Sequence, residues 1–116
     1  MDGVPVDRMF RAFSDPTRLR ILHLLAAGEL CVGDIVTVLK VPQPTASRHL
    51  GYLRRARLIS ARKKSYWTFY GLTSPRSSFH RKLLECLKSC FRDVPELARD
   101  SERLKRVRTR GGCCPT

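Results

Sequence analysis

The sequence predicts a mainly helical protein with one β-hairpin, arranged as a winged helix-turn-helix. Three observations predict this fold. Segments of helical periodicity fill the first 56 residues, a gap of about four residues separates two of them, and β-branched and aromatic runs follow. The chain has 116 residues and is 42% hydrophobic, which is enough for one small domain with its own core.

Two short amphipathic helices are expected before Gly28. The first places apolar side chains at helical spacing, at Val6, Met9, Phe10 and Phe13. It stops at Ser14, where Asp15 can cap a second helix that has Pro16 at its first position. The second helix is expected to end at Gly28.

The next two helices are expected to form the helix-turn-helix. The third begins near Glu29 and breaks at Val41 and Pro42. It places three side chains on one face, Cys31, Ile35 and Leu39. The fourth begins at Gln43 and Pro44. Its inward face is formed by Ala46, Leu50 and Leu53, and the short connection between the two helices is typical of a helix-turn-helix.

A hairpin is expected after Ala56. Residues 58–61 and 66–70 are the two candidate strands, because both are rich in β-branched or aromatic residues. Residues 62–65 between them form a basic tip. This tip lacks the Gly or Asn that tight hairpin turns favour, so we expect a looser loop. One hairpin on a helical domain is a wing.

A fifth helix is expected to carry an apolar stripe made of Phe79, Leu83, Cys86, Leu87, Cys90 and Val94. Pro95 closes or bends it, and residues 96–108 can form a charged sixth helix that carries Leu97, Leu104 and Val107. The first helix is also apolar. Pairing of these terminal helices across a two-fold axis is the simplest way to bury both, which predicts a homodimer.

Positive charge is concentrated in the middle of the chain. The whole sequence has 23 Lys and Arg against 10 Asp and Glu, a formal charge of +13. Residues 35–84 contain eleven basic residues and no acidic one. Because solvated surfaces usually mix both signs, this stretch is expected to bind a polyanion.

The sequence shows no sign of export or of a membrane partner. No stretch approaches the roughly 18 apolar residues that a membrane span needs, and the N-terminus lacks the pattern of a signal peptide. We therefore expect a cytoplasmic protein, whose five cysteines would be reduced thiols.

Double-stranded DNA is the polyanion that this fold predicts, because the second helix of a helix-turn-helix enters the major groove. Gln pairs with adenine and Arg with guanine, while basic residues beyond the helix contact phosphates. For His49, packing against the hairpin is an equally weighted alternative to contacting DNA. The expected DNA-binding residues are Gln43, Thr45, Ser47, Arg48, His49, Tyr52, Arg54, Arg55, Arg62, Lys63 and Lys64. On this basis residues 1–92 form a DNA-binding and dimerisation domain, and residues 93–116 a charged helix with a cysteine-bearing tail.

Three ordered blocks of the sequence resemble the ArsR/SmtB family of winged-helix repressors. They are FSDPTRLRIL at 13–22, ELCVGDI at 29–35 and QPTASRHL at 43–50, within a match that covers about residues 6–92. The resemblance implies a homodimeric bacterial repressor that sits on an operator and leaves it when a metal or metalloid binds.

The known metal sites of this family do not match the sequence. Arsenic-sensing members often carry three thiols in the block Glu-Leu-Cys-Val-Cys-Asp-Leu-Cys, but this chain keeps only Cys31 and has Gly33 and Val36 at the other two places. Cys31 is therefore expected to be a core residue rather than a ligand. Zinc is not expected on the fifth helix, where His80 should be exposed; His23 should be partly packed.

Cys113 and Cys114 are the strongest chemical signal among the cysteines, because adjacent thiols after two glycines have no evident packing role. Thiolates select soft ions, and the family resemblance suggests trivalent arsenic or antimony bound by three of them. The expected ligands are Cys90, Cys113 and Cys114, with Cys86 and Cys31 as less favoured alternatives. No organic cofactor is expected.

Three other functions compete with metalloid sensing. In the first, Cys113 or Cys114 forms a disulfide with Cys90 and makes the protein a redox-sensing repressor of the same fold. The second is a small thiol reductase, but the chain has no Cys-x-x-Cys motif beside a βαβ pattern and no acid–base constellation, so we do not expect an enzyme. The third is an architectural DNA-binding protein without an effector.

Overall fold

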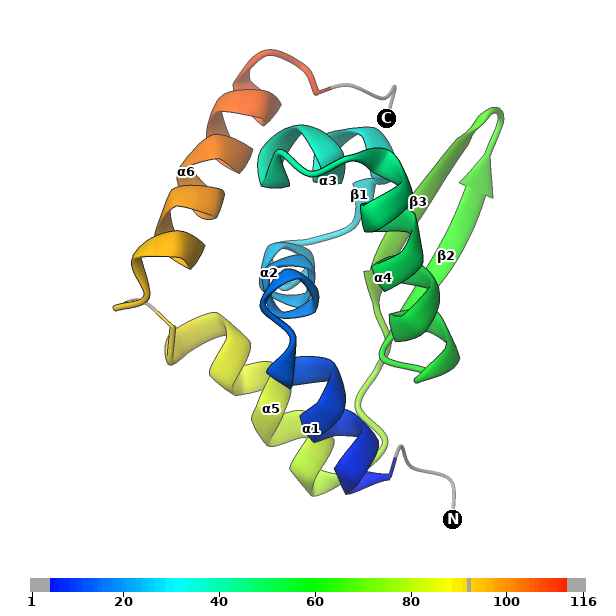
Figure 1. The fold of residues 1–116 in the computed structure, drawn as a ribbon, viewed down its shortest axis with the longest axis vertical. Helices are drawn as coiled ribbons and strands as arrows, with labels where there is room; N and C mark the ends of the chain where they lie inside the picture. The colour runs from blue at the N-terminus through cyan, green and yellow to red at the C-terminus, as the bar shows by residue number, and fades with distance from the viewer. Residues whose placement is uncertain (1–4, 92, 113–116) are drawn as a thin grey trace.

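The computed structural model describes residues 5–91 and 93–112, and these form a helical domain with a small antiparallel sheet (Figure 1). The helices are α1 (Val6–Ser14), α2 (Pro16–Leu25), α3 (Val32–Leu39), α4 (Gln43–Arg55), α5 (Ser78–Ser89) and α6 (Pro95–Thr109). The strands are β1 (Leu30–Cys31), β2 (Ile59–Lys64) and β3 (Trp67–Leu72). This architecture confirms the predicted winged helix-turn-helix.

The core surrounds α2, which lies at the centre of the molecule (Figure 1). Four residues of α2 are buried, at Ile21, Leu22, Leu24 and Leu25. Helices α1, α3, α4, α5 and α6 each contribute apolar side chains to the same cluster, including Met9, Ile35, Leu50, Leu87 and Leu104. The helix begins cleanly because the Asp15 side chain accepts hydrogen bonds from the amides of Thr17 and Arg18, at 2.9 and 3.0 Å.

The segment before α3 is a strand, and the expectation of a helix beginning near Glu29 is wrong. Leu30 pairs with Tyr70 and Cys31 with Phe69, which places β1 at the edge of a sheet of order β1-β3-β2. The hydrogen bonds to β3 hold these two residues extended, although their apolar spacing suits a helix. Cys31 therefore precedes α3 instead of sharing its inward face.

The hairpin is longer and tighter than expected. Its strands pair without interruption from Ile59 and Leu72 to Lys64 and Trp67. Only two residues connect them, and Ser65 has a φ of 58°, the left-handed conformation that Gly or Asn usually adopts in such turns. The basic residues of the predicted tip therefore belong to β2, and the looser loop does not form.

Helix α5 is shorter than its apolar stripe. It ends at Ser89, with Cys90 as its C-terminal cap, and Val94 precedes α6 instead of continuing α5. The predicted sixth helix is confirmed, and its apolar residues Leu97, Leu104 and Val107 are buried.

A buried ion pair joins α6 to α2. Asp100 is fully buried, and its two carboxylate oxygens accept hydrogen bonds from Arg20, Nε at 2.8 Å and Nη2 at 2.9 Å. Arg20 Nη2 also donates to the carbonyl oxygen of Leu39 at the end of α3, at 3.1 Å. These contacts hold α6 on the same two helices that support α4. None of the helices in the described ranges has the length and apolar character that crossing a bilayer requires.

Candidate nucleic-acid interface

Helix α4 presents a polar face because its opposite face is fixed in the core. Lys40 ends α3 in the left-handed conformation with a φ of 56°, and α4 begins three residues later. Ala46, Leu50 and Leu53 are at most 1% exposed. Since successive helical residues turn by about 100°, Ser47 and Arg48 between them face away from the core.

Most of the predicted DNA-binding residues lie on this outer face or on the wing. Five of the predicted residues on α4 are exposed, at Gln43, Ser47, Arg48, Arg54 and Arg55, while Thr45 and Tyr52 are half-buried. Three basic residues of β2, Arg62, Lys63 and Lys64, are exposed as well. Helix α4 packs against β2, so both sets belong to one side of the molecule (Figure 1).

His49 is the predicted DNA-binding residue that the structure turns inward. It is 9% exposed, and its Nδ1 lies 4.0 Å from Oδ1 of Asp15, the cap of α2. Burial lowers the pKa of His49, while the charge of Asp15 opposes that shift. The spacing of three residues from Ala46 already places His49 near the inward face, and we therefore leave it out of the DNA contacts proposed below.

Arg62 on the wing already has a partner within the protein. Its guanidinium donates to both carboxylate oxygens of Glu29, with Nε 3.2 Å from Oε2. It also lies 5.1 Å from the ring centroid of Phe69. The hydrogen bond from Arg62 lowers the pKa of Glu29. Arg62 therefore differs from Lys63 and Lys64, although all three follow one another in the sequence.

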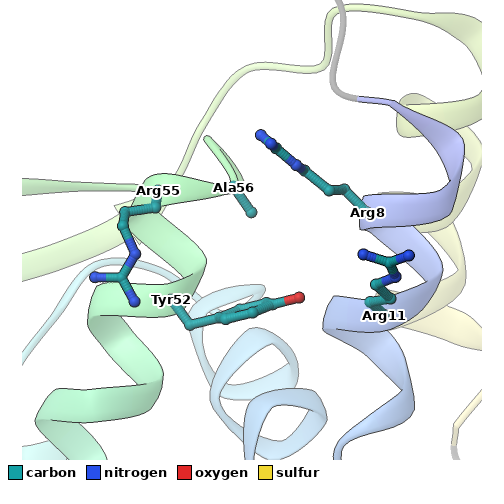
Figure 2. Close-up of a pocket in the computed structure, with 5 residues that line it drawn as sticks. All are labelled: Arg8, Arg11, Tyr52, Arg55 and Ala56. Carbon is teal, nitrogen blue, oxygen red and sulfur yellow. The ribbon is translucent and has the colours of Figure 1, made fainter.

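Two arginines of α1 were missed by sequence reasoning. Arg8 and Arg11 face α4 across a cleft of about 310 Å³, which is also lined by Tyr52, Arg55 and Ala56 (Figure 2). Their spacing of three residues puts them on one side of α1, but only the packing of α1 beside α2 and α4 shows which helix they face.

The cysteines of the described chain occupy two places. Cys31 is 1% exposed and takes part in a disulfide bond, whereas Cys86 and Cys90 are free. The expectation that every cysteine is a reduced thiol is therefore wrong for Cys31. Cys90 is exposed and Cys86 half-buried, and a hydrogen bond with Cys90 raises the pKa of Cys86. Cys113 and Cys114 lie outside the described residues.

The histidines and carboxylates do not build a metal site in the described part of the chain. Residues 5–91 and 93–112 contain no group of three or more His, Cys, Asp or Glu side chains that could hold a metal ion. His80 is 1% exposed, so its expected exposure is wrong; its Nδ1 accepts a hydrogen bond from the amide of Arg76 at 3.2 Å. His23 is half-buried, as expected.

Known proteins resemble both this sequence and this fold. A family model described as bacterial regulatory protein, arsR family, matches residues 15–61. An uncharacterized HTH-type transcriptional regulator of Methanocaldococcus jannaschii is 47% identical over 78 residues, which are 66% of this chain and 88% of that protein. The arsenical resistance operon repressor of Escherichia coli is 39% identical over 79 residues, covering 67% of this chain and 68% of that protein.

A solved structure extends the similarity to three dimensions. The homodimeric winged helix-turn-helix DNA-binding domain of Mb0332 from Mycobacterium bovis superposes with a TM-score of 0.61 at 29% sequence identity. The superposition covers 73% of this chain and 76% of that domain.

Proposed function

Because the chain belongs to the arsR family of bacterial regulatory proteins, we propose that it is a cytoplasmic transcriptional repressor that binds operator DNA as a homodimer. The single observation that carries this proposal is the exposed polar and basic face of α4, held opposite a buried apolar face. The relatives named above that have a stated role are transcriptional regulators, which confirms the prediction that the chain is not an enzyme.

The exposed residues of α4 have the chemistry needed to read a major groove. Gln43 and Arg48 can make paired hydrogen bonds to adenine and guanine, and Thr45 and Ser47 can contact bases or phosphates. Basic residues at the end of α4 and on the wing then lie where the sugar-phosphate backbone passes, namely Arg54, Arg55, Arg62, Lys63 and Lys64. To contact a phosphate, Arg62 has to donate to Glu29 and the phosphate at once or break its hydrogen bonds to Glu29.

Two observations support a homodimer built on α1 and α5. Phe10 is 57% exposed on α1, an unusual position for a large apolar side chain, and Val6 is 49% exposed. The Phe10 ring packs edge to face on Phe79 of α5, with centroids 5.4 Å apart, so the two helices form one apolar surface. In this proposal residues 1–92 bind DNA and dimerise, and residues 93–116 supply the sixth helix and the cysteine-bearing tail.

The proposed effector is trivalent arsenic or antimony bound by Cys90, Cys113 and Cys114. Support comes from the arsenical resistance repressor among the relatives and from the exposed Cys90 thiol beside Cys86, which remains the alternative third ligand. A soft, thiol-seeking ion would tie the tail to the end of α5. A shift of α5 at the dimer seam would change the spacing of the two α4 helices, which must match half-sites about 34 Å apart.

A redox-sensing repressor of the same fold is the second candidate; Cys31 already takes part in a disulfide bond, although Cys90 itself is free. In this candidate hydrogen peroxide oxidises two thiols to a disulfide; two electrons and two protons pass to the hydrogen peroxide, which becomes two waters. Cys90 with Cys113 or Cys114 is the proposed pair. This disulfide bond would tie the tail to the C-terminal end of α5, as the metalloid would in the first candidate.

A single titration separates the two candidates. The reduced full-length protein is bound to a fluorescent duplex selected from a random pool, and arsenite, antimonite or peroxide is added while the anisotropy is followed. Release by arsenite or antimonite in excess reductant, lost in Cys90→Ser and retained in Ser78→Ala at the other end of α5, supports metalloid sensing. Release by peroxide alone supports the redox candidate. If the reduced protein fails to bind any duplex at low salt, the proposed function is wrong.

A further inference from the structure

We infer that the cleft between α1 and α4 binds a phosphate group of the DNA backbone, and that Arg8 and Arg11 are therefore part of the DNA interface. The inference rests on the proposed function, but it adds a helix that lies outside the helix-turn-helix and the wing. It is argued from the charge, the geometry and the position of the cleft.

Three arginines line this small cleft, and the guanidinium groups of Arg8 and Arg11 extend into it from α1 (Figure 2). Arg8 and Arg11 come from α1 and Arg55 from the end of α4, and all three are exposed. The guanidinium presents paired N–H groups that match two oxygens of a phosphate, and it stays charged at every physiological pH. A cleft of about 310 Å³ is large enough to admit such a group from solvent.

The protein neutralises little of this charge itself. Arg11 pairs with Asp7 at 3.9 Å, but both side chains are about 70% exposed, and an ion pair of this kind contributes little. The guanidinium groups of Arg8 and Arg11, side by side on α1, repel each other, so a bound anion relieves a cost that is present in the free protein (Figure 2). The chemistry of the lining thus selects an anion with several acceptor oxygens.

Tyr52 provides a neutral donor whose position is already fixed. The guanidinium of Arg18 lies over its ring, 4.0 Å from the centroid. Arg18 is in turn held by hydrogen bonds to the carbonyl oxygens of Arg11, at 2.8 Å, and Ala12, at 3.3 Å. In Figure 2 the Tyr52 hydroxyl points toward α1, and Arg8 extends from α1 toward Ala56. A donor that is held in advance loses little entropy on binding.

The position of the cleft identifies the anion as a backbone phosphate. Arg48, Tyr52 and Arg55 are spaced by four and three residues, so the cleft continues the proposed base-reading face toward the C-terminal end of α4. The N-terminal residues of a recognition helix contact the bases. The 13 residues of α4 span about 20 Å, whereas the major groove is about 12 Å wide. The C-terminal end of α4 should therefore meet the sugar-phosphate backbone.

The test measures how DNA affinity depends on salt for Arg8→Ala, Arg55→Ala and the double variant. Each lost phosphate contact lowers the slope of log K against log salt by about 0.9. When the salt concentration rises from 50 to 200 mM, the DNA affinity of such a variant should therefore fall by a factor about 3.5-fold smaller than the factor by which the wild-type affinity falls. Because both arginines serve one phosphate, the double variant should lower the slope by about 0.9 in total and not by twice that value, and each single variant should lower it by no more than this.

Arg99→Ala is the matched control. Arg99 is an exposed arginine of α6, and α6 lies on the side of the molecule away from α4 (Figure 1), so its loss removes the same charge without affecting the slope. Sedimentation of each variant checks that dimerisation is unchanged. Arg55→Ala, which lies on α4, keeps the test valid if a change on α1 disturbs the dimer.

Two results would overturn the inference while leaving the proposed function intact. One is a double variant whose slope equals that of Arg55→Ala, which means that Arg8 contributes nothing; the other is a double variant whose slope falls by about twice 0.9, which means separate phosphates. Binding of inorganic phosphate is followed by ³¹P line width in the absence of DNA. If Arg8→Ala weakens that binding but not the DNA slope, the cleft takes a free phosphate instead. A wild-type protein that binds no DNA refutes the proposed function itself.

Discussion

Arg48 and Lys63 are both exposed cations, one on α4 and one on the wing. Arg48→Ala should weaken binding to the selected duplex by about 1–3 kcal/mol and relax base preference, because a paired contact to guanine is lost. Lys63→Ala should weaken binding to all sequences alike and lower the salt slope by about one, because only a phosphate contact is lost. Anisotropy on selected and scrambled duplexes measures both effects. Equal effects of the two variants on scrambled DNA would contradict the role given to α4.

His80 makes a prediction about stability and pH. Burial lowers its pKa below the unfolded value near 6.5, and the charge of Arg76 lowers it further. The folded state therefore binds the proton less well than the unfolded state. The contribution of neutral His80 to the free energy of unfolding is complete above about pH 6.5, and it is lost as the pH falls toward the pKa of His80 in the folded state. Burial lowers the pKa of His23 and His49 in the same direction.

Urea unfolding at several pH values between 8 and 5 tests this prediction. The free energy of unfolding should fall below pH 6.5 with a slope of at most about 1.4 kcal/mol per pH unit for each histidine. His80→Gln cannot titrate, so it should show a smaller slope than the wild type. A slope unchanged by that substitution would mean that His80 does not contribute.

At the scale of elements, α6 is held by a contact that its own sequence does not reveal. Leu97, Leu104 and Val107 give α6 an apolar stripe. Asp100 is buried on the same side, but in the sequence it cannot be distinguished from the other charged residues of this polar helix. Its partner Arg20 is 80 residues away in the sequence. Because Asp100 is buried away from water, the hydrogen bonds from Arg20 replace the hydration of its carboxylate. Both bonds are 2.9 Å or shorter, which is typical of strong charge-assisted hydrogen bonds.

Removing one half of this ion pair should be costly. Asp100→Ala leaves Arg20 partly buried without its main partner and should lower the free energy of unfolding by about 3–5 kcal/mol. Glu102→Ala breaks only the exposed pair with Lys105 at 3.4 Å and should cost less than about 1 kcal/mol. Urea denaturation of both variants compares the two. A loss in Asp100→Ala no larger than in Glu102→Ala would show that α6 is held by its apolar residues alone.

The wing shows how one residue can change the length of an element. Ser65 adopts a positive φ, and this allows a two-residue connection where the sequence predicts four. Because the strands then pair up to Lys64, the basic side chains alternate between the two faces of a ladder instead of sharing a flexible loop. This alternation is why Arg62 meets Glu29 and the Phe69 ring while Lys63 points elsewhere.

At the scale of the whole molecule, the proposed dimer depends on the apolar surface of α1 and α5. Phe10→Asp places a charge in that surface and should convert the dimer to a monomer, because burying an unpaired carboxylate costs several kcal/mol. Tyr66→Ser, at a residue 93% exposed on the wing, should leave the mass unchanged. Analytical ultracentrifugation measures both masses. A dimeric Phe10→Asp variant would place the interface elsewhere.

Much of this molecule follows from local pattern. The helical spacing of Ala46, Leu50 and Leu53, the cap at Asp15 and the acid-free middle of the chain predict the helices, their order and the polyanion-binding side. These features can be read from the sequence because they depend on residues within one or two turns of each other. The presence and order of the fold's helices and hairpin belong to this part.

Packing between distant segments decided the rest. Residues 30–31 are extended because β3 offers them hydrogen bonds, and His49 and His80 are buried because neighbouring elements cover them. Asp100 finds Arg20, and Arg8 faces Tyr52, only once the helices are assembled. A sequence determines which groups it carries and their local periodicity; which groups meet across the fold depends on the free energy of all contacts together, so only the tertiary structure decides it.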